Sequence, residues 1–162
     1  AIKKNLTNEQ THDEVIDVMN TLNDQTSAIM KQYNISACTD VTGFGLLGHL
    51  NEMCQGSKLS SRISYDIIPL ILNTEKFAKD GIIPGGTKSN FKFLEKNINF
   101  NKSIKPFQKF ILSDAQTSGG LLIACNKSQS HQLLKKLNSS LYYKSVIIGE
   151  FTNKKDYNIY CD

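Results

Sequence analysis

The sequence predicts an α+β fold in which a mixed β-sheet is flanked by α-helices. Helical and strand-like patterns of hydrophobic residues interleave along the 162 residues, and such interleaving is typical of layered domains that contain both elements. Some connections are long enough to cross over a sheet, whereas the strands near the ends resemble antiparallel additions. The length suits one domain with a sizeable core, and neither an internal repeat nor a linker interrupts it. A single domain over residues 1–162 is therefore expected.

Composition and charge exclude several broad classes. Hydrophobic residues make up 40% of the chain and charged residues 21%, which is ordinary for a globular protein. No apolar run approaches the roughly 20 residues that cross a bilayer, and the N-terminal segment lacks the apolar centre of a secretory signal. The net charge of +4 is spread over scattered lysines, whereas a nucleic-acid surface needs a denser basic stripe. We expect a cytoplasmic protein with no membrane or nucleic-acid partner.

The clearest expected helix runs from Thr11 to about Tyr33. Thr11 and Glu14 have the spacing of a capping box, in which two side chains satisfy unpaired amides of the first turn. The apolar residues of this segment recur at a helical period and are expected to lie in the core: Val15, Val18, Met19, Leu22, Ile29, Met30 and Tyr33.

Two strands and a helix are expected next. Ile35 to Asp40 is a strand or an extended approach, and Ser61 to Ile68 alternates as a half-buried strand does before Pro69 stops it. Between them, a helix opens at Thr42-Gly43-Phe44-Gly45 and ends at Gln55-Gly56. Its apolar side comprises Leu46, Leu47, Leu50, Met53 and Cys54.

The second half of the chain has clear and unclear segments. Residues 90–105 show no decisive pattern. A short helix is expected around Phe107, Phe110 and Ile111, before Ser113. The other expected elements are a helix over Leu70–Lys79 with an Asp80-Gly81 cap, a loop over Ile83–Thr87, a tight loop over Asp114–Gly120, a strand over Leu121–Cys125, a helix over Ser128–Leu137, and strands over Ser145–Phe151 and Tyr157–Tyr160.

Three loops combine glycines with hydroxyl or carboxylate groups, over residues 37–45, 84–87 and 114–120. Glycine permits a close backbone approach, and successive free amides can form an anion-binding concavity. Neither of the last two loops fits the P-loop pattern, because no Gly-Lys-Ser/Thr follows at the required spacing. Tight turns and close strand–helix packing are equally compatible with these glycines.

Asp40 stands just ahead of the second expected helix, where a carboxylate has two possible roles. It can cap the helix or complement its dipole, and residue chemistry alone favours this role. It can also ligate Mg²⁺, which takes one or two carboxylates together with waters and phosphate oxygens.

The cysteines and histidines do not form a recognisable centre. Cys38, Cys54, Cys125 and Cys161 are too widely spaced for a disulfide scaffold or a zinc knuckle, so free thiols are expected. His49 is expected to be a structural residue of the second helix. No Ser-His-Asp or Cys-His arrangement stands out.

Read together, three segments closely resemble signature segments of the selenophosphate synthetase (selenide, water dikinase) family. They are Ala37 to His49 (ACTDVTGFGLLGH), Gly81 to Thr87 (GIIPGGT) and Asp114 to Leu122 (DAQTSGGLL), in the family's order and at about its spacing. The resemblance extends from near Ala1 to about Leu137. It implies a fold like the C-terminal domain of aminoimidazole ribonucleotide synthetase, within a two-domain plan that usually dimerises.

The resemblance also implies an activity and a set of site residues. The activity converts selenide, ATP and water into selenophosphate, AMP and phosphate, with ATP and selenide as small-molecule substrates and Mg²⁺ as the cofactor. Asp40 matches a family aspartate that helps bind the Mg²⁺ ions on the ATP phosphates. The positions that match residues lining or shaping the cleft are Thr42, Gly43, Gly85, Gly86, Thr87, Ser118, Gly119 and Gly120.

The parts that the resemblance assigns to an N-terminal half have no match in this chain. These are the reactive Cys or selenocysteine, a neighbouring Lys, a glycine-rich ATP loop and further metal-binding aspartates. The chain, which begins at Ala1 without a methionine, is therefore expected to be the C-terminal domain of a longer enzyme and to be inactive alone. Cys38 does not fill the place of the nucleophile. The alternatives are a non-catalytic binding or dimerisation module of the same fold and a related ATP-using enzyme of the superfamily.

Overall fold

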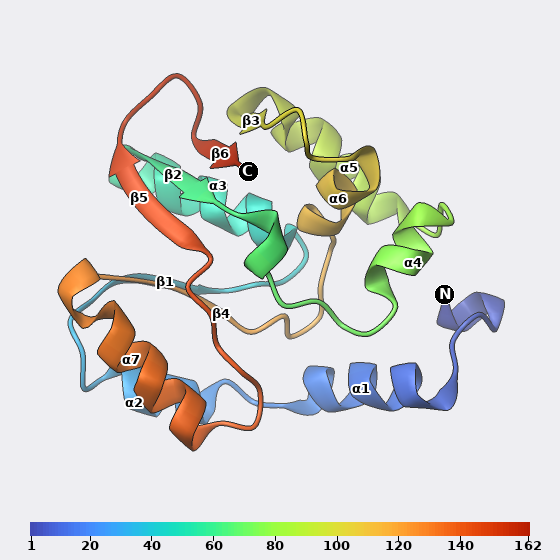
Figure 1. The fold of residues 1–162 in the computed structure, drawn as a ribbon, viewed down its shortest axis with the longest axis horizontal. Coiled ribbons are helices and arrows are strands. Elements are labelled where there is room, and N and C mark those ends of the chain that lie inside the picture. Colours follow the sequence, from blue (N-terminus) through green and yellow to red (C-terminus); the bar gives the residue numbers. More distant parts are fainter.

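The computed structural model describes all residues, 1–162, as an α+β fold (Figure 1), which confirms the expected class. The helices are α1 (Glu9–Asn20), α2 (Asp24–Met30), α3 (Gly45–Ser57), α4 (Thr74–Lys79), α5 (Gly85–Leu94), α6 (Pro106–Leu112) and α7 (Lys127–Ser140). The strands are β1 (Ile35–Asp40), β2 (Leu59–Ile63), β3 (Ile98–Phe100), β4 (Leu121–Cys125), β5 (Gly149–Asn153) and β6 (Ile159–Cys161).

The larger sheet is mixed and has the strand order β3-β6-β2-β5. β6 pairs in parallel with β2 and with β3, whereas β5 pairs antiparallel with β2. Helix α3 packs on this sheet, and its Leu47 and Cys54 share the main core with Ile63 and Ile159 of the strands. This arrangement confirms the apolar side that the sequence predicts for the second helix.

The smaller sheet consists of β1 and β4, paired antiparallel with Asp40 opposite Leu121. Helices α2 and α7 lie together beside it (Figure 1), and Ile29, Leu133 and Leu137 form a separate buried cluster there. Both strands have the predicted bounds. The strands divide between two sheets. The sequence did not predict this division, because the alternation of apolar and polar residues does not indicate which strands pair.

The expected single helix over Thr11–Tyr33 is wrong, because the chain leaves the helical conformation between α1 and α2. Thr21 has an extended backbone, with φ −73° and ψ 118°, and its hydroxyl donates to the carbonyl of Asp17 at 2.7 Å. Asn23 and Asp24 then start a new helix. Polar residues of this kind compete with the helix for backbone hydrogen bonds, so they favour an end and a new start.

The capping box predicted for Thr11 and Glu14 is also absent. The helix begins earlier, at Glu9, and its N-cap is Asn8, whose side-chain oxygen accepts from the Thr11 amide at 2.9 Å. The Thr11 hydroxyl instead accepts from Asn73 at 2.8 Å, and the Glu14 carboxylate accepts from the Leu72 amide at 3.1 Å. Both residues therefore fix α1 to the segment before α4.

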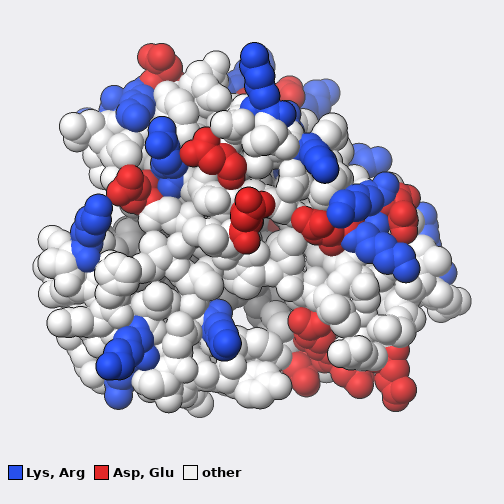
Figure 2. Space-filling model, in the orientation of Figure 1, with Lys and Arg blue, Asp and Glu red and all other residues white.

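The apolar stripe expected to be core is mostly outside it. Ile29 is buried, but Met19 is 38% exposed and Leu22 is 74% exposed. Helix α1 runs along one side of the molecule (Figure 1), and acidic side chains gather over this region in Figure 2. The lysines on the same face are scattered in Figure 2.

Several boundaries differ from the expectation. The strand placed over Ser61–Ile68 ends at Ile63, and Tyr65–Ile67 forms a 3-10 turn. The loop placed over Ile83–Thr87 is in part the first turn of α5, and the strand placed over Ser145–Phe151 begins only at Gly149. No helix has the length and apolarity needed to cross a membrane.

Candidate functional site

Backbone hydrogen bonds join the first and third glycine-containing loops, and side-chain contacts of α5 add the second. The carbonyl of Val41 accepts from Gly119 at 2.9 Å, and the amide of Val41 donates to Gly120 at 2.9 Å. The carbonyl of Thr42 accepts from Gln116 at 3.0 Å. The segment after β1 and the Asp114–Gly120 loop thus form one unit, although more than seventy residues separate them in sequence.

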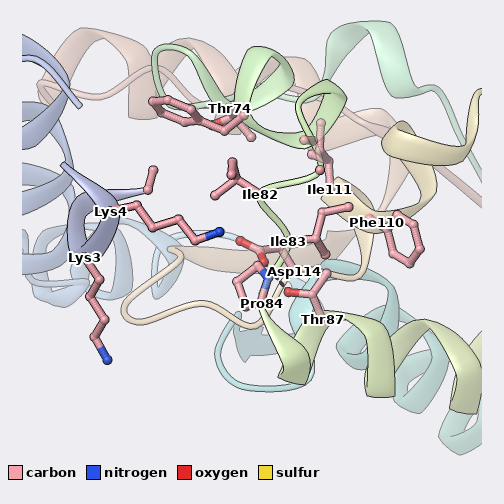
Figure 3. Close-up of a pocket in the computed structure, with 14 residues that line it drawn as sticks. Lys3, Lys4, Thr74, Ile82, Ile83, Pro84, Thr87, Phe110, Ile111 and Asp114 are labelled. Atoms are coloured by element: carbon pink, nitrogen blue, oxygen red, sulfur yellow. Dashed lines mark hydrogen bonds between the residues drawn. The ribbon is translucent and has the colours of Figure 1, made fainter. Parts of the chain in front are cut away.

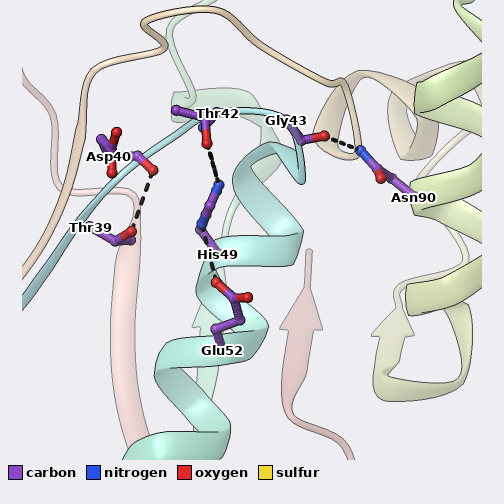
Figure 4. Close-up of polar contacts among 7 residues, drawn as sticks. All are labelled: Thr39, Asp40, Thr42, Gly43, His49, Glu52 and Asn90. Atoms are coloured by element: carbon purple, nitrogen blue, oxygen red, sulfur yellow. Dashed lines mark hydrogen bonds and ion pairs between the residues drawn. The ribbon is translucent and has the colours of Figure 1, made fainter.

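Asn90, on α5, joins the helix that begins in the 84–87 loop to the first loop and to the residue before the 114–120 loop. Its side-chain amide donates to the carbonyl of Gly43 at 2.8 Å and to that of Ser113 at 3.2 Å (Figure 4 shows the first contact). The sequence analysis missed Asn90. The signal was its spacing of three residues from Thr87, which places both side chains on the same face of a helix.

Gly45 allows the first and third loops to approach closely. Its φ is +69°, and a Cβ atom there would lie 2.6 Å from the carbonyl oxygen of Asp114 and 2.8 Å from the carbonyl carbon of Ser113. Only glycine adopts this conformation without strain and leaves that space free. The close approach explains the glycine that begins α3 in the first signature segment.

Asp40 lies at the end of β1 with its side chain exposed. Its carboxylate makes no hydrogen bond or ion pair, and the contact drawn at Asp40 in Figure 4 joins its backbone carbonyl oxygen to the Thr39 hydroxyl. It does not cap α3, whose first turn has no side-chain cap. The capping interpretation is therefore wrong, whereas the role of complementing the helix dipole stays a prediction, and the carboxylate has no protein partner.

Cys38, two residues before Asp40, is exposed. Desolvation of the sulfur and then the nearby Asp40 carboxylate raise the pKa of the Cys38 thiol. The thiolate is the nucleophilic form of cysteine, so this environment disfavours a reactive role. All four cysteines are free thiols, as the sequence predicts.

His49 is buried and contacts the segment that follows Asp40 (Figure 4). Its Nε2 lies 3.1 Å from the Thr42 amide and 3.2 Å from the Thr42 hydroxyl, while its Nδ1 lies 3.2 Å from the Glu52 carboxylate. His49 therefore has the expected structural role, because its ring connects α3 to the segment that follows Asp40.

A second feature is a cavity of about 380 Å³ beside α4 and α5 (Figure 3). Phe77, Ile83 and Phe110 supply apolar walls, and Lys4 and Asp114 supply charge. The Thr87 hydroxyl donates to the Asp114 carboxylate. Burial raises the pKa of the Asp114 carboxyl, and this hydrogen bond opposes the effect.

The predicted site residues do not all share this cavity. Thr87 lines it, whereas Asp40, Thr42, Gly43, Gly85, Gly86, Ser118, Gly119 and Gly120 do not. Thr42, Gly43, Gly119 and Gly120 lie in the two hydrogen-bonded loops, and Ser118 adjoins them with a left-handed φ of 52°. Gly85, Gly86 and Thr87 form the first turn of α5. Most of the predicted site residues therefore lie near the junction of the first and third loops, next to Asp40, and not in this cavity.

At this position the chain offers a metal ion one carboxylate ligand and not a complete set of protein ligands. No group of three or more His, Cys, Asp or Glu side chains is placed to hold an ion. A single unpartnered carboxylate fits a hard cation such as Mg²⁺, which keeps waters and phosphate oxygens as its other ligands. It does not fit zinc, whose structural and catalytic sites use three or four protein ligands.

Comparison with known proteins identifies the family of the chain. Residues 1–162 match the family described as AIR synthase related protein, C-terminal domain. The chain is 39% identical over 150 residues to a selenide, water dikinase of Aliarcobacter butzleri, covering 93% of this chain and 43% of the relative. It is 38% identical over 163 residues to that of Caldanaerobacter subterraneus, covering 99% and 46%, and 40% identical over 150 residues to that of Carboxydothermus hydrogenoformans, covering 93% and 42%.

The chain spans slightly less than half the length of these curated relatives. The match to the family model, in contrast, extends over the whole chain. The three glycine-containing loops lie inside this match. The chain belongs to the AIR synthase related C-terminal domain family.

Proposed function

We propose that this chain is the C-terminal domain of a two-domain selenide, water dikinase. The enzyme would make selenophosphate from selenide, ATP and water and release AMP and phosphate. The observation that carries the proposal is that the three signature segments contact one another, through Val41 and Thr42 with the 114–120 loop and through Thr87 with Asp114, while the Asp40 carboxylate next to Val41 has no protein partner. The names of relatives at 38–40% identity support the same reaction.

In this proposal, Asp40 holds Mg²⁺ together with ligands from outside the chain. The ion would neutralise charge on the ATP phosphates, since phosphoryl transfer depends mainly on positioning and electrostatic stabilisation. The Asp40 carboxylate would bind and orient the ion. Its exposure and its lack of a protein partner support this role, because no existing ion pair has to break first.

The glycine-containing segments would bind and orient the phosphates. Pro84 provides no side-chain cap to α5, and Gly85 and Gly86 are exposed whereas Thr87 is buried. The uncapped amides of Gly85 and Gly86 would therefore face an anion at the positive end of the helix. Thr42, Gly43, Ser118, Gly119 and Gly120 would shape the cleft next to Asp40. A homodimer in the cytoplasm belongs to the same proposal.

The test is phosphorus NMR of the full-length enzyme with Mg-ATP and selenide, beside Asp40→Ala. We expect a selenophosphate signal that falls at least about a hundredfold in the variant, as for loss of one strong transition-state contact. Asp156→Ala is the matched control, because Asp156 is also an exposed aspartate, in the turn before β6. Intact ATP and no selenophosphate from the unmodified enzyme would refute the proposal.

Two other functions make different predictions in this experiment. A binding or dimerisation module would leave ATP unchanged. A related ATP-using enzyme would consume ATP without needing selenide. The names of the relatives favour the selenide reaction over both.

A further inference from the structure

We propose that His49 is a positioning residue for the metal-binding segment, acting through the Thr42 amide. The inference rests on the proposed function, since it assumes that Asp40 binds a divalent cation. It assigns a role to a histidine that makes no contact with the proposed substrates. The argument concerns the hydrogen-bonding capacity of one buried nitrogen atom.

The contact fixes the state of the imidazole. The Thr42 N–H donates to Nε2 at 3.1 Å, so Nε2 must present its lone pair and the ring proton must sit on Nδ1. Nδ1 faces Glu52 Oε2 at 3.2 Å, although no well-aligned hydrogen bond forms there. The exposed Glu52 carboxylate favours a proton on Nδ1, which leaves Nε2 as an acceptor.

The ring is held in place on the remaining sides. The side chain of His49 is 9% exposed, and Phe44 contacts it edge to face, with 5.9 Å between ring centroids. His49 also lies within the first two turns of α3, whose neighbouring leucines are part of the main core. The acceptor atom therefore lies in a well-packed part of the molecule, beside the main core.

The contact completes the hydrogen bonding of the segment after Asp40. The amide and carbonyl of Val41 and the carbonyl of Thr42 are held by the Gly119, Gly120 and Gln116 backbone. The Thr42 amide remains, and His49 is its acceptor. The His49 side chain thus connects this segment to α3. It does so at Thr42, which is two residues from the proposed metal ligand Asp40.

The same geometry disfavours a proton-transfer role for His49. Two groups of Thr42, the amide and the hydroxyl, converge on the single Nε2 lone pair. A general base needs that lone pair free for the reacting proton. The amide, which has no alternative acceptor, occupies it, so the role that fits is one of orientation.

The test compares two amide substitutions in the full-length enzyme. In His49→Gln, the side-chain oxygen reaches about the position of Nε2 and can accept from Thr42 without a titrating ring. In His49→Asn, the side chain is one methylene shorter and does not reach Thr42. Manganese(II) dissociation constants would be measured by EPR with a non-hydrolysable ATP analogue bound, together with the melting temperature of each variant.

We expect the Gln variant to bind Mn²⁺ within about threefold of the unmodified enzyme and the Asn variant to bind at least about tenfold more weakly. Equal affinities of the two variants at equal melting temperature would overturn the inference. It would also fail if the Gln variant bound Mn²⁺ normally but formed no selenophosphate, because the imidazole would then be required for chemistry.

If the Asn variant does not fold, the inference is tested on the Gln variant alone. Amide hydrogen exchange at Thr42 reports the hydrogen bond directly, and we expect protection to persist in His49→Gln. Rapid exchange there, with Mn²⁺ affinity retained, would overturn the inference. If the unmodified enzyme forms no selenophosphate, the proposed reaction is refuted. The inference about His49 is still tested, because its comparison depends on Mn²⁺ affinity.

Discussion

At the scale of single residues, Asp114 is a carboxyl group in an environment that disfavours its charge. Burial raises its pKa above the ordinary value of 3.8, and the Thr87 hydrogen bond only partly opposes this. Between the unfolded and the raised folded pKa, the folded state therefore binds more protons than the unfolded state. The contribution of Asp114 to stability is full below the unfolded pKa and is lost as pH rises through the folded value.

Asp114→Asn should remove this pH dependence. The Asn oxygen still accepts from Thr87, but the side chain cannot ionise. We expect the variant to have a higher melting temperature than the unmodified protein at about pH 7, and the difference to shrink towards about pH 4. Thermal unfolding across this range measures both. A variant that is less stable at about pH 7 would mean that the ionised carboxylate contributes favourably to the fold.

At the scale of elements, α1 and α3 differ in how their apolar residues are used. Leu47 of α3 is completely buried, whereas Leu22, just after α1, is 74% exposed. Leu47→Ala should lower the free energy of unfolding by about 2–5 kcal/mol through lost burial and a residual cavity. Leu22→Ser should change it by less than about 0.5 kcal/mol.

Urea unfolding of residues 1–162, followed by circular dichroism, distinguishes the two outcomes. Similar slopes of the unfolding transition would show that both variants retain the same native compactness. A large loss of stability in Leu22→Ser would contradict the exposed position of this side chain.

The sequence predicted elements well where periodicity and glycine boundaries agreed. β1 and β4 have the predicted bounds, and α3 has the predicted buried face, because glycines or turn residues flank these segments. The break between α1 and α2 was missed because the apolar period continues across Thr21–Asn23. The first turn of α5 was missed because Gly85 and Gly86 disfavour helices, and tertiary contacts of Thr87 and Asn90 override that preference.

The site was predictable as three segments but not as an arrangement. Motif resemblance selected the loops around Asp40, Gly85 and Gly119. Asn90 and Asp114 make contacts with residues that are far away in the sequence. His49 contacts Thr42 in the segment before its own helix. No local sequence pattern encodes these contacts. The roles of the glycines beyond close packing stay predictions.

At the scale of the whole molecule, the loops around Asp40 lie between two packing units. The main core contains α3 and the larger sheet, and a smaller cluster joins α2 and α7 to the β1–β4 pair. The segment from Val41 to Gly45 leaves the smaller sheet and enters α3. The Asp114–Gly120 loop returns from α6 to β4. A ligand at this junction would therefore contact segments from both units.

The same layout leads to the last prediction, that residues 1–162 alone do not turn over ATP. The chain provides one free carboxylate at the junction and no cluster of metal-binding side chains, whereas phosphoryl transfer needs a complete electrostatic clamp around the phosphates. In phosphorus NMR with Mg-ATP and selenide, we expect the isolated chain to leave ATP at the level of a protein-free control, while circular dichroism shows it folded. Turnover that disappears in the Asp40→Ala chain would contradict this expectation and would mean that the C-terminal domain binds and activates ATP unaided.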